Sequence, residues 1–134
     1  MKKLKIINLV SLIVAIMLEA LPFGIQMKWS DEGLSTVMYH SYFDPLVWGA
    51  SGDMSPFICC IFTVVLIGFC LTSLFIKKAP SWTHTVMLCI SWIAFAFSMM
   101  PLIPNHYTTI SGLISVIFIL SAEINAVIKN KIKK

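Results

Sequence analysis

Residues 56–76 read PFICCIFTVVLIGFCLTSLFI, a run of 21 residues that contains no charged side chain. As a helix it would be about 31 Å long, which matches the roughly 30 Å hydrocarbon core of a bilayer. A segment that crosses a bilayer must satisfy its backbone hydrogen bonds internally, so the run predicts a transmembrane helix. Three further apolar runs of similar length cover residues 6–27, 83–103 and 108–128.

The composition excludes an ordinary soluble domain. Of the 134 residues, 58% are hydrophobic and 12% are charged, about half the usual charged share of roughly 25%. A compact fold of this size could not hide so much apolar surface from water. We therefore expect an all-α integral membrane four-helix bundle, one domain over residues 1–134, with a long outer loop over residues 28–55. The expected partner is the lipid bilayer, and nucleic acid is not expected.

The lysines predict the orientation. Nine of the ten lie before the first run, after the second or after the fourth, which places them on one side of the membrane. The loop 28–55 contains one lysine, Lys28, and four acidic residues. By the positive-inside rule, we expect a multi-pass protein of the cell membrane with both termini in the cytoplasm. The first run is not expected to be cleaved as a signal peptide, because Leu18 would stand where the peptidase needs a small residue.

Glu19 carries the main functional hypothesis. It lies roughly 20 Å along the first run from Ile6, inside a core of about 30 Å, where an acidic residue is costly and normally faces protein or water. One interpretation is a proton or cation site. The other is a protonated carboxyl bonded to a serine or to the carbonyl of Leu18. That carbonyl would be freed by Pro22, which is expected to kink the first span.

Glu123 is the second acidic residue inside a predicted span. It would lie near the inner surface, where we expect a structural ion pair with a lysine. Lys78 is the candidate partner, with Lys5 and Lys77 as alternatives. Glu19 and Glu123 would lie near opposite faces of the membrane, so a shared two-carboxylate site is not expected.

The outer loop is rich in aromatic residues, which favours a segment that lies on the membrane surface or caps the bundle. His40 and Asp44 are four residues apart and would share a face if helical, as metal ligands can. His106, on the short loop between the last two spans, could approach them. His40 and Asp44 could also simply pair at the water interface. We expect no metal and no cofactor.

Small and hydroxyl residues predict the faces on which the helices pack, because lipid tails give no hydrophobic push between helices. These faces would seal a monomeric bundle, or one would stay free for a homo-oligomer or a membrane protein partner. The four cysteines are expected to be packing residues, and His84 is expected to be solvated. The predicted packing residues are Gly68, Thr72, Ser91, Ala94, Ser98, Ser111, Gly112, Ser115, Ala122 and Ala126.

Two resemblances bear on function. Residues 15–19, followed by residues 27–30, resemble the first helix of small multidrug resistance transporters, which implies that Glu19 exchanges protons and drug. The long outer loop and the strong charge bias depart from that family. Residues 18–24, 41–45 and 55–57 resemble small uncharacterised four-span membrane proteins of Gram-positive bacteria. This likeness implies the same topology and no particular activity.

No nucleophile–base arrangement, phosphate loop or zinc motif occurs in the sequence, so an enzyme is not expected. The leading prediction is a non-enzymatic membrane protein that acts as an accessory or interaction component. The alternative is a small proton- or cation-coupled transporter or channel that works through Glu19.

Overall fold

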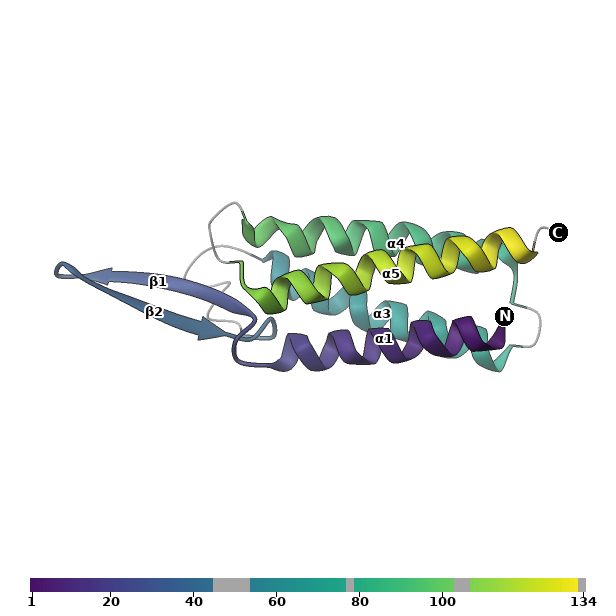
Figure 1. Cartoon of the computed structure of the whole chain (residues 1–134), viewed down its shortest axis with the longest axis horizontal. Helices are drawn as coiled ribbons and strands as arrows, with labels where there is room; N and C mark the ends of the chain where they lie inside the picture. Colours follow the sequence, from purple (N-terminus) through teal and green to yellow (C-terminus); the bar gives the residue numbers. More distant parts are fainter. Residues whose placement is uncertain (45–53, 77–78, 103–106, 133–134) are drawn as a thin grey trace.

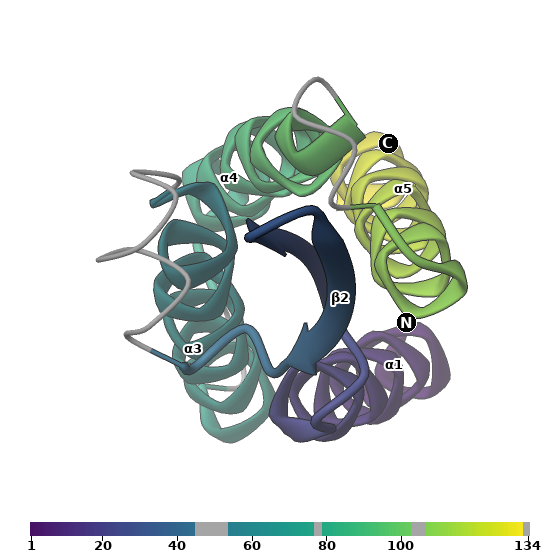
Figure 2. The ribbon, with the colours of Figure 1, turned by 90° about the vertical axis from the view of Figure 1, so that its left-hand side faces the viewer.

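The computed structural model describes residues 1–44, 54–76, 79–102 and 107–132. Long helices pack side by side in a ring, in which α1 and α4 each contact both α3 and α5 (Figures 1 and 2). Helix α1 begins and α5 ends at the same end of the bundle, which we call the inner end (Figure 1). The opposite, outer end carries a two-stranded sheet. The described elements are α1 (Lys2–Ala20), β1 (Ile25–Asp31), β2 (Leu34–His40), α3 (Ser55–Phe75), α4 (Ser81–Met99), a 3₁₀ turn (Met100–Leu102) and α5 (Thr109–Ile132).

Among the described residues, three helical segments are long and apolar enough to cross a membrane: α3, α4 with its 3₁₀ turn, and α5. This makes the chain compatible with a membrane protein. Helix α1 differs because its 19 residues include three lysines and Glu19. Between its basic start and Glu19, however, its exposed face is apolar throughout. That face consists of Ile6, Ile7, Val10, Ile13, Val14 and Met17.

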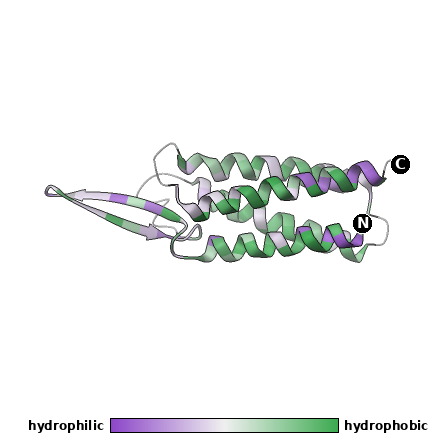
Figure 3. Ribbon diagram, in the orientation of Figure 1, coloured by the Kyte–Doolittle hydropathy of each residue, from purple (hydrophilic) through white to green (hydrophobic). Residues whose placement is uncertain are grey.

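The hydropathy of the bundle changes along the length of its helices. Hydrophobic residues cover the middle of the helices, and hydrophilic residues gather where α1 begins and α5 ends (Figure 3). Many of the buried side chains are polar, Thr63, Ser91 and Asn125 among them. Apolar residues outside and polar residues between helices form the pattern expected when lipid is the solvent.

The first helix ends earlier than predicted. The apolar run was expected to stay helical to Met27 with a kink at Pro22, but α1 ends at Ala20. The cause is Pro22, because the residue before a proline is disfavoured in the helical region. Leu21 is extended, with φ −67° and ψ 140°, and its N–H donates to the carbonyl of Leu18 at 3.2 Å. The proline therefore stops the helix instead of bending it.

The outer loop over residues 28–55 was expected to lie on the membrane surface or to cap the bundle, but its first part departs from this together with the end of the first predicted span, residues 25–40. They form an antiparallel hairpin in which Met27 pairs with Met38. The turn residues Glu32 and Gly33 have φ values of 47° and 85°, and positive φ at both central positions is typical of a type I′ turn. The hairpin projects away from the helices (Figure 1), so the fold is helical with a small sheet and not all-α. Residues 45–53 lie outside the described residues.

The predicted packing residues of α4 and most of those of α5 are buried, which confirms those two faces. Gly68 and Thr72, the residues predicted for α3, are exposed, so this face does not seal the described bundle, and its use by a homo-oligomer or a membrane protein partner stays a prediction. The hydroxyl of Thr72 donates to the carbonyl of Gly68 at 2.8 Å and is thus satisfied on its own helix.

Of the four cysteines, which were expected to be packing residues, Cys89 is exposed and the other three are buried.

Candidate functional site

Glu19 lies in the last turn of α1 and is fully buried. Its Oε1 atom is 2.7 Å from Oγ1 of Thr63 on α3, and that hydroxyl is also 2.9 Å from the carbonyl oxygen of Cys59. A threonine hydroxyl has one hydrogen, so an ionised carboxylate and the Cys59 carbonyl must share it, whereas a protonated carboxyl can donate to Thr63 and leave that hydrogen to Cys59. The geometry thus favours the protonated, structural interpretation of Glu19, with a threonine in the place of the expected serine.

Tyr42 closes the outer end above Glu19. Its N–H donates to the carbonyl of Glu19 at 3.0 Å, and its ring is only 1% exposed. The ring packs on Gly24, where an added Cβ would lie 2.9 Å from a ring carbon. Burial raises the pKa of the Tyr42 hydroxyl above its usual value, so the group stays neutral. We call Glu19, Tyr42, Thr63 and the neighbouring Cys59 and Cys60 the outer cluster.

The link between α1 and β1 is fixed to α5. The carbonyl of Gly24 accepts hydrogen bonds from the hydroxyls of Thr108, at 2.7 Å, and Ser111, at 2.8 Å. Pro22 is exposed in the same link, so it ends the helix but lines no part of the outer cluster. These bonds hold the base of the hairpin against the bundle.

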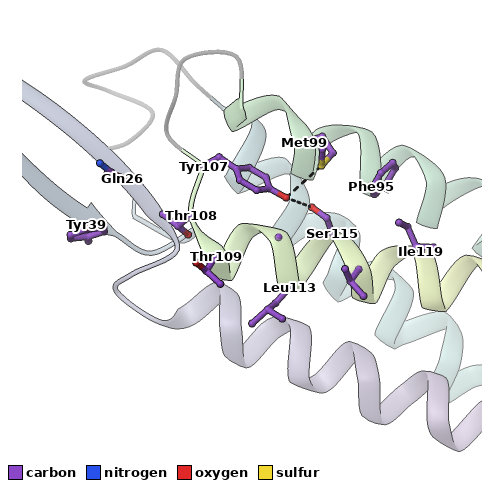
Figure 4. Close-up of a pocket in the computed structure, with 12 residues that line it drawn as sticks. Gln26, Tyr39, Phe95, Met99, Tyr107, Thr108, Thr109, Leu113, Ser115 and Ile119 are labelled. Carbon is purple, nitrogen blue, oxygen red and sulfur yellow. Dashed lines mark hydrogen bonds between the residues drawn. The ribbon is translucent and has the colours of Figure 1, made fainter.

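A groove of about 870 Å³ lies between the base of the hairpin and helices α4 and α5 (Figure 4). Its outer part presents the polar groups of Gln26, Tyr107 and Thr108. The Tyr107 hydroxyl donates to Sδ of Met99 at 3.6 Å and is 3.5 Å from Oγ of Ser115, both long contacts. Glu19 does not line this groove. Its deeper wall is apolar and includes Phe95, Leu113, Val116 and Ile119.

A second set of polar side chains lies in the inner half of the bundle, and we call it the inner cluster. Lys5 donates to the carbonyl of Ser73 at 2.8 Å, and Asn8 Nδ2 donates to Sγ of Cys70 at 3.2 Å. These bonds join α1 to α3. Across the bundle, Nδ1 of His84 lies 3.1 Å from Oδ1 of Asn125, which joins α4 to α5.

His84 was expected to be solvated, and this prediction is wrong. The ring is 1% exposed because α5 covers it and Asn125 supplies a partner. A spacing in the sequence indicates that His84 is buried. His84, Ser91 and Ser98 recur every seven residues, which keeps them on one helix face, and Ser91 and Ser98 bond serines of α5.

His40 and Asp44 do pair, with Nδ1 and Oδ2 2.7 Å apart, as the simpler alternative proposed. They meet across a turn and not along a helix, because His40 ends β2. His106 lies outside the described residues. Within the described part of the chain, no three His, Cys, Asp or Glu side chains come together as metal ligands could.

The predicted ion pair between Glu123 and Lys78 involves a residue outside the described ranges. Glu123 itself is exposed on α5, and no ion pair among the described residues includes it. Lys5, one of the alternative partners, instead bonds the carbonyl of Ser73.

No protein-family model, no curated protein and no solved structure matches this chain. Its function must therefore be inferred from the geometry of the bundle and the hairpin.

Proposed function

We propose that this chain is a four-span protein of the cell membrane, with both termini in the cytoplasm. We propose further that it is a non-enzymatic interaction component, whose hairpin binds a protein partner on the outer side. The observation that carries the proposal is the hairpin. It is an exposed, partly apolar strand pair held on a rigid helical base.

A fourth span through α1 is supported by where its charges lie. Lys2, Lys3 and Lys5 stand at the inner end, and Glu19 is enclosed by protein. The face that remains exposed between them is apolar and suits lipid. With α1 in the membrane, the basic residues at both ends of the described chain fall on one side, as the positive-inside rule requires.

The low stability expected of an isolated hairpin supports a binding role. A single two-stranded hairpin is marginal in water, and here only its base is anchored, by the buried Ile25 and Met27. Its outer part keeps both strand edges free of further strands within the described chain, and such edges can pair with a strand of a partner. The exposed apolar side chains are Trp29, Leu34, Val37, Met38 and Tyr39.

Photo-crosslinking in cells tests this role. Benzoylphenylalanine placed at Val37, on the hairpin, should give a discrete protein adduct. The same residue at Val64, on the exposed face of α3, is the matched control and should not give that adduct. A Leu34→Asp change near the tip should weaken the Val37 adduct. No adduct at Val37, or the same adduct from Val64, would contradict the proposal.

Transport through Glu19 remains the alternative, favoured by one observation: Oε2 of Glu19 has no hydrogen-bond partner among the described residues. A transporter needs a polar route from that carboxyl to water on each side. Tyr42 covers Glu19 from the outside, and a fully buried apolar layer of Leu12, Leu66 and Phe118 lies toward the inside. A Glu19→Gln variant that expresses normally but loses a transport phenotype would favour this alternative over the interaction role.

A further inference from the structure

The inner cluster contains a histidine whose tautomer is set by its neighbours. Asn125 Nδ2 donates to the carbonyl of Ser121 at 2.8 Å, which turns Oδ1 of Asn125 toward His84. An amide oxygen only accepts, so Nδ1 of His84 must carry the hydrogen. In the neutral ring, Nε2 is then a bare acceptor. It is buried and has no hydrogen-bond partner among the described residues.

Asn8 leaves a second acceptor unpaired in the same half of the bundle. Its amide nitrogen donates to Cys70, and its oxygen Oδ1 has no partner within the described chain, although the residue is 2% exposed. A buried acceptor without a donor costs roughly 1–3 kcal/mol, so two in one region call for a ligand that donates.

The cluster adjoins a cavity at the inner end. Lys5 and Ser73 belong to the cluster and also line a cavity of about 420 Å³, together with Lys2 and Ile76. His84 lies in the first turn of α4, at the same end of the bundle as Lys5. Lys5 lies three residues before Asn8 on α1, and Ser73 lies three residues after Cys70 on α3, so the cavity is about one helical turn from the Asn8–Cys70 pair.

We propose that the inner cluster is a water-binding site, in which water enters past Lys5 and donates hydrogen bonds to Asn8 Oδ1 and His84 Nε2. The neighbouring charge of Lys5 disfavours a cation as the ligand. An anion would need donors, but the two unpaired atoms accept. Water donates to such atoms and can also accept from Lys5, as buried water does in polar interiors. This hydration would let a buried His84 exchange protons with the inner solvent. It does not depend on what the hairpin binds.

The direct probe is water itself. In the full chain reconstituted in lipid bilayers, solid-state NMR can measure how fast polarisation passes from water protons to assigned side chains. The side chains of His84 and Asn8 should receive it as fast as exposed residues such as Lys131. Leu12 and Phe118 are the dry references. Transfer to His84 and Asn8 as slow as transfer to Leu12 would overturn the proposal.

The entry route has its own test with the native cysteines. One variant keeps only Cys70, in the inner cluster, and its matched control keeps only Cys59, in the outer cluster. A small anionic methanethiosulfonate applied to the inner side should modify Cys70 about tenfold faster than Cys59, because it reacts with thiols that water reaches. Equal modification rates for Cys70 and Cys59 would overturn the entry of water past Lys5. Faster modification of Cys70 by reagent added on the outer side would show that water does not enter at the inner end.

Discussion

The two ends of the bundle hold buried polar clusters that are closed in different ways. At the outer end, Oε1 of Glu19 has a hydroxyl partner in Thr63, Oε2 has none among the described residues, and the carboxyl lies under the ring of Tyr42. At the inner end, Asn8 and His84 each keep an unpaired acceptor, and Lys5 lies one turn from Asn8 beside a cavity. An aromatic ring excludes water, whereas a lysine side chain beside a cavity admits it. The difference indicates a sealed outer end that supports the hairpin and a hydrated inner end.

The largest effect should come from breaking the layer that separates the clusters. Phe118→Ala removes a fully buried ring from α5 and should lower the free energy of unfolding by about 3–4 kcal/mol. Val116→Ala, at an exposed position on the same helix, is the control and should change it little. Denaturant titration in mixed micelles measures both. A Phe118 variant as stable as the Val116 variant would show that no closed layer divides the bundle.

The inner cluster should be sensitive to its asparagine. Asn125→Leu leaves the Nδ1–H of His84 without its acceptor and should destabilise the protein by about 2 kcal/mol. Asn130→Leu, at an exposed position near the end of α5, should cost little. The same titration compares the two. Equal stabilities would mean that water already replaces Asn125 fully, which would make the inner end wetter than proposed.

The seal at the outer end can be loosened with one methyl group. Gly24→Ala places a Cβ 2.9 Å from the Tyr42 ring and should cost about 1 kcal/mol by displacing that ring. Gly68→Ala meets open space on α3 and should stabilise the helix by a similar amount, about 1 kcal/mol. Thermal unfolding in detergent should move in opposite directions for the two variants. A shift in the same direction would argue against a tight seal at Tyr42.

The smallest effect is expected where α4 and α5 meet near the outer end. Ser98 and Ser115 are 2.8 Å apart, and hydrogen bonds between helices in membranes contribute about 0.6 kcal/mol on average. A double-mutant cycle of Ser98→Ala and Ser115→Ala should return a coupling of that size. A coupling above about 2 kcal/mol would mean that this bond contributes far more than a typical interhelical bond.

The helices could be predicted from the sequence because hydropathy reports burial in lipid directly. The end of α1 could not be predicted, because an apolar run does not distinguish a helix from a strand. The apolar run of the first span extends through Ile25–Met27, which are the first residues of β1. Two local features of the sequence indicate the end of the helix and the hairpin. Pro22 stops a helix, and Glu32-Gly33 suits a tight hairpin turn.

The candidate site could be predicted only in part. Burial of Glu19 and a hydroxyl partner followed from its depth in an apolar run. The identity of that partner did not, because whether Thr63 meets Glu19 depends on how α1 and α3 rotate and slide against each other. The same holds for His84, whose burial depends on Asn125, 41 residues away.

The measurement that tests the account most directly asks which end of the bundle faces outward. Cysteine placed at Val37 in the hairpin, and separately at Lys131 near the end of α5, would be introduced into a chain without its native cysteines. A membrane-impermeant maleimide added to intact cells should label position 37 at once and position 131 only after permeabilisation. Labelling of position 131 in intact cells, or protection of position 37, would contradict the proposed orientation and with it the outward-facing hairpin.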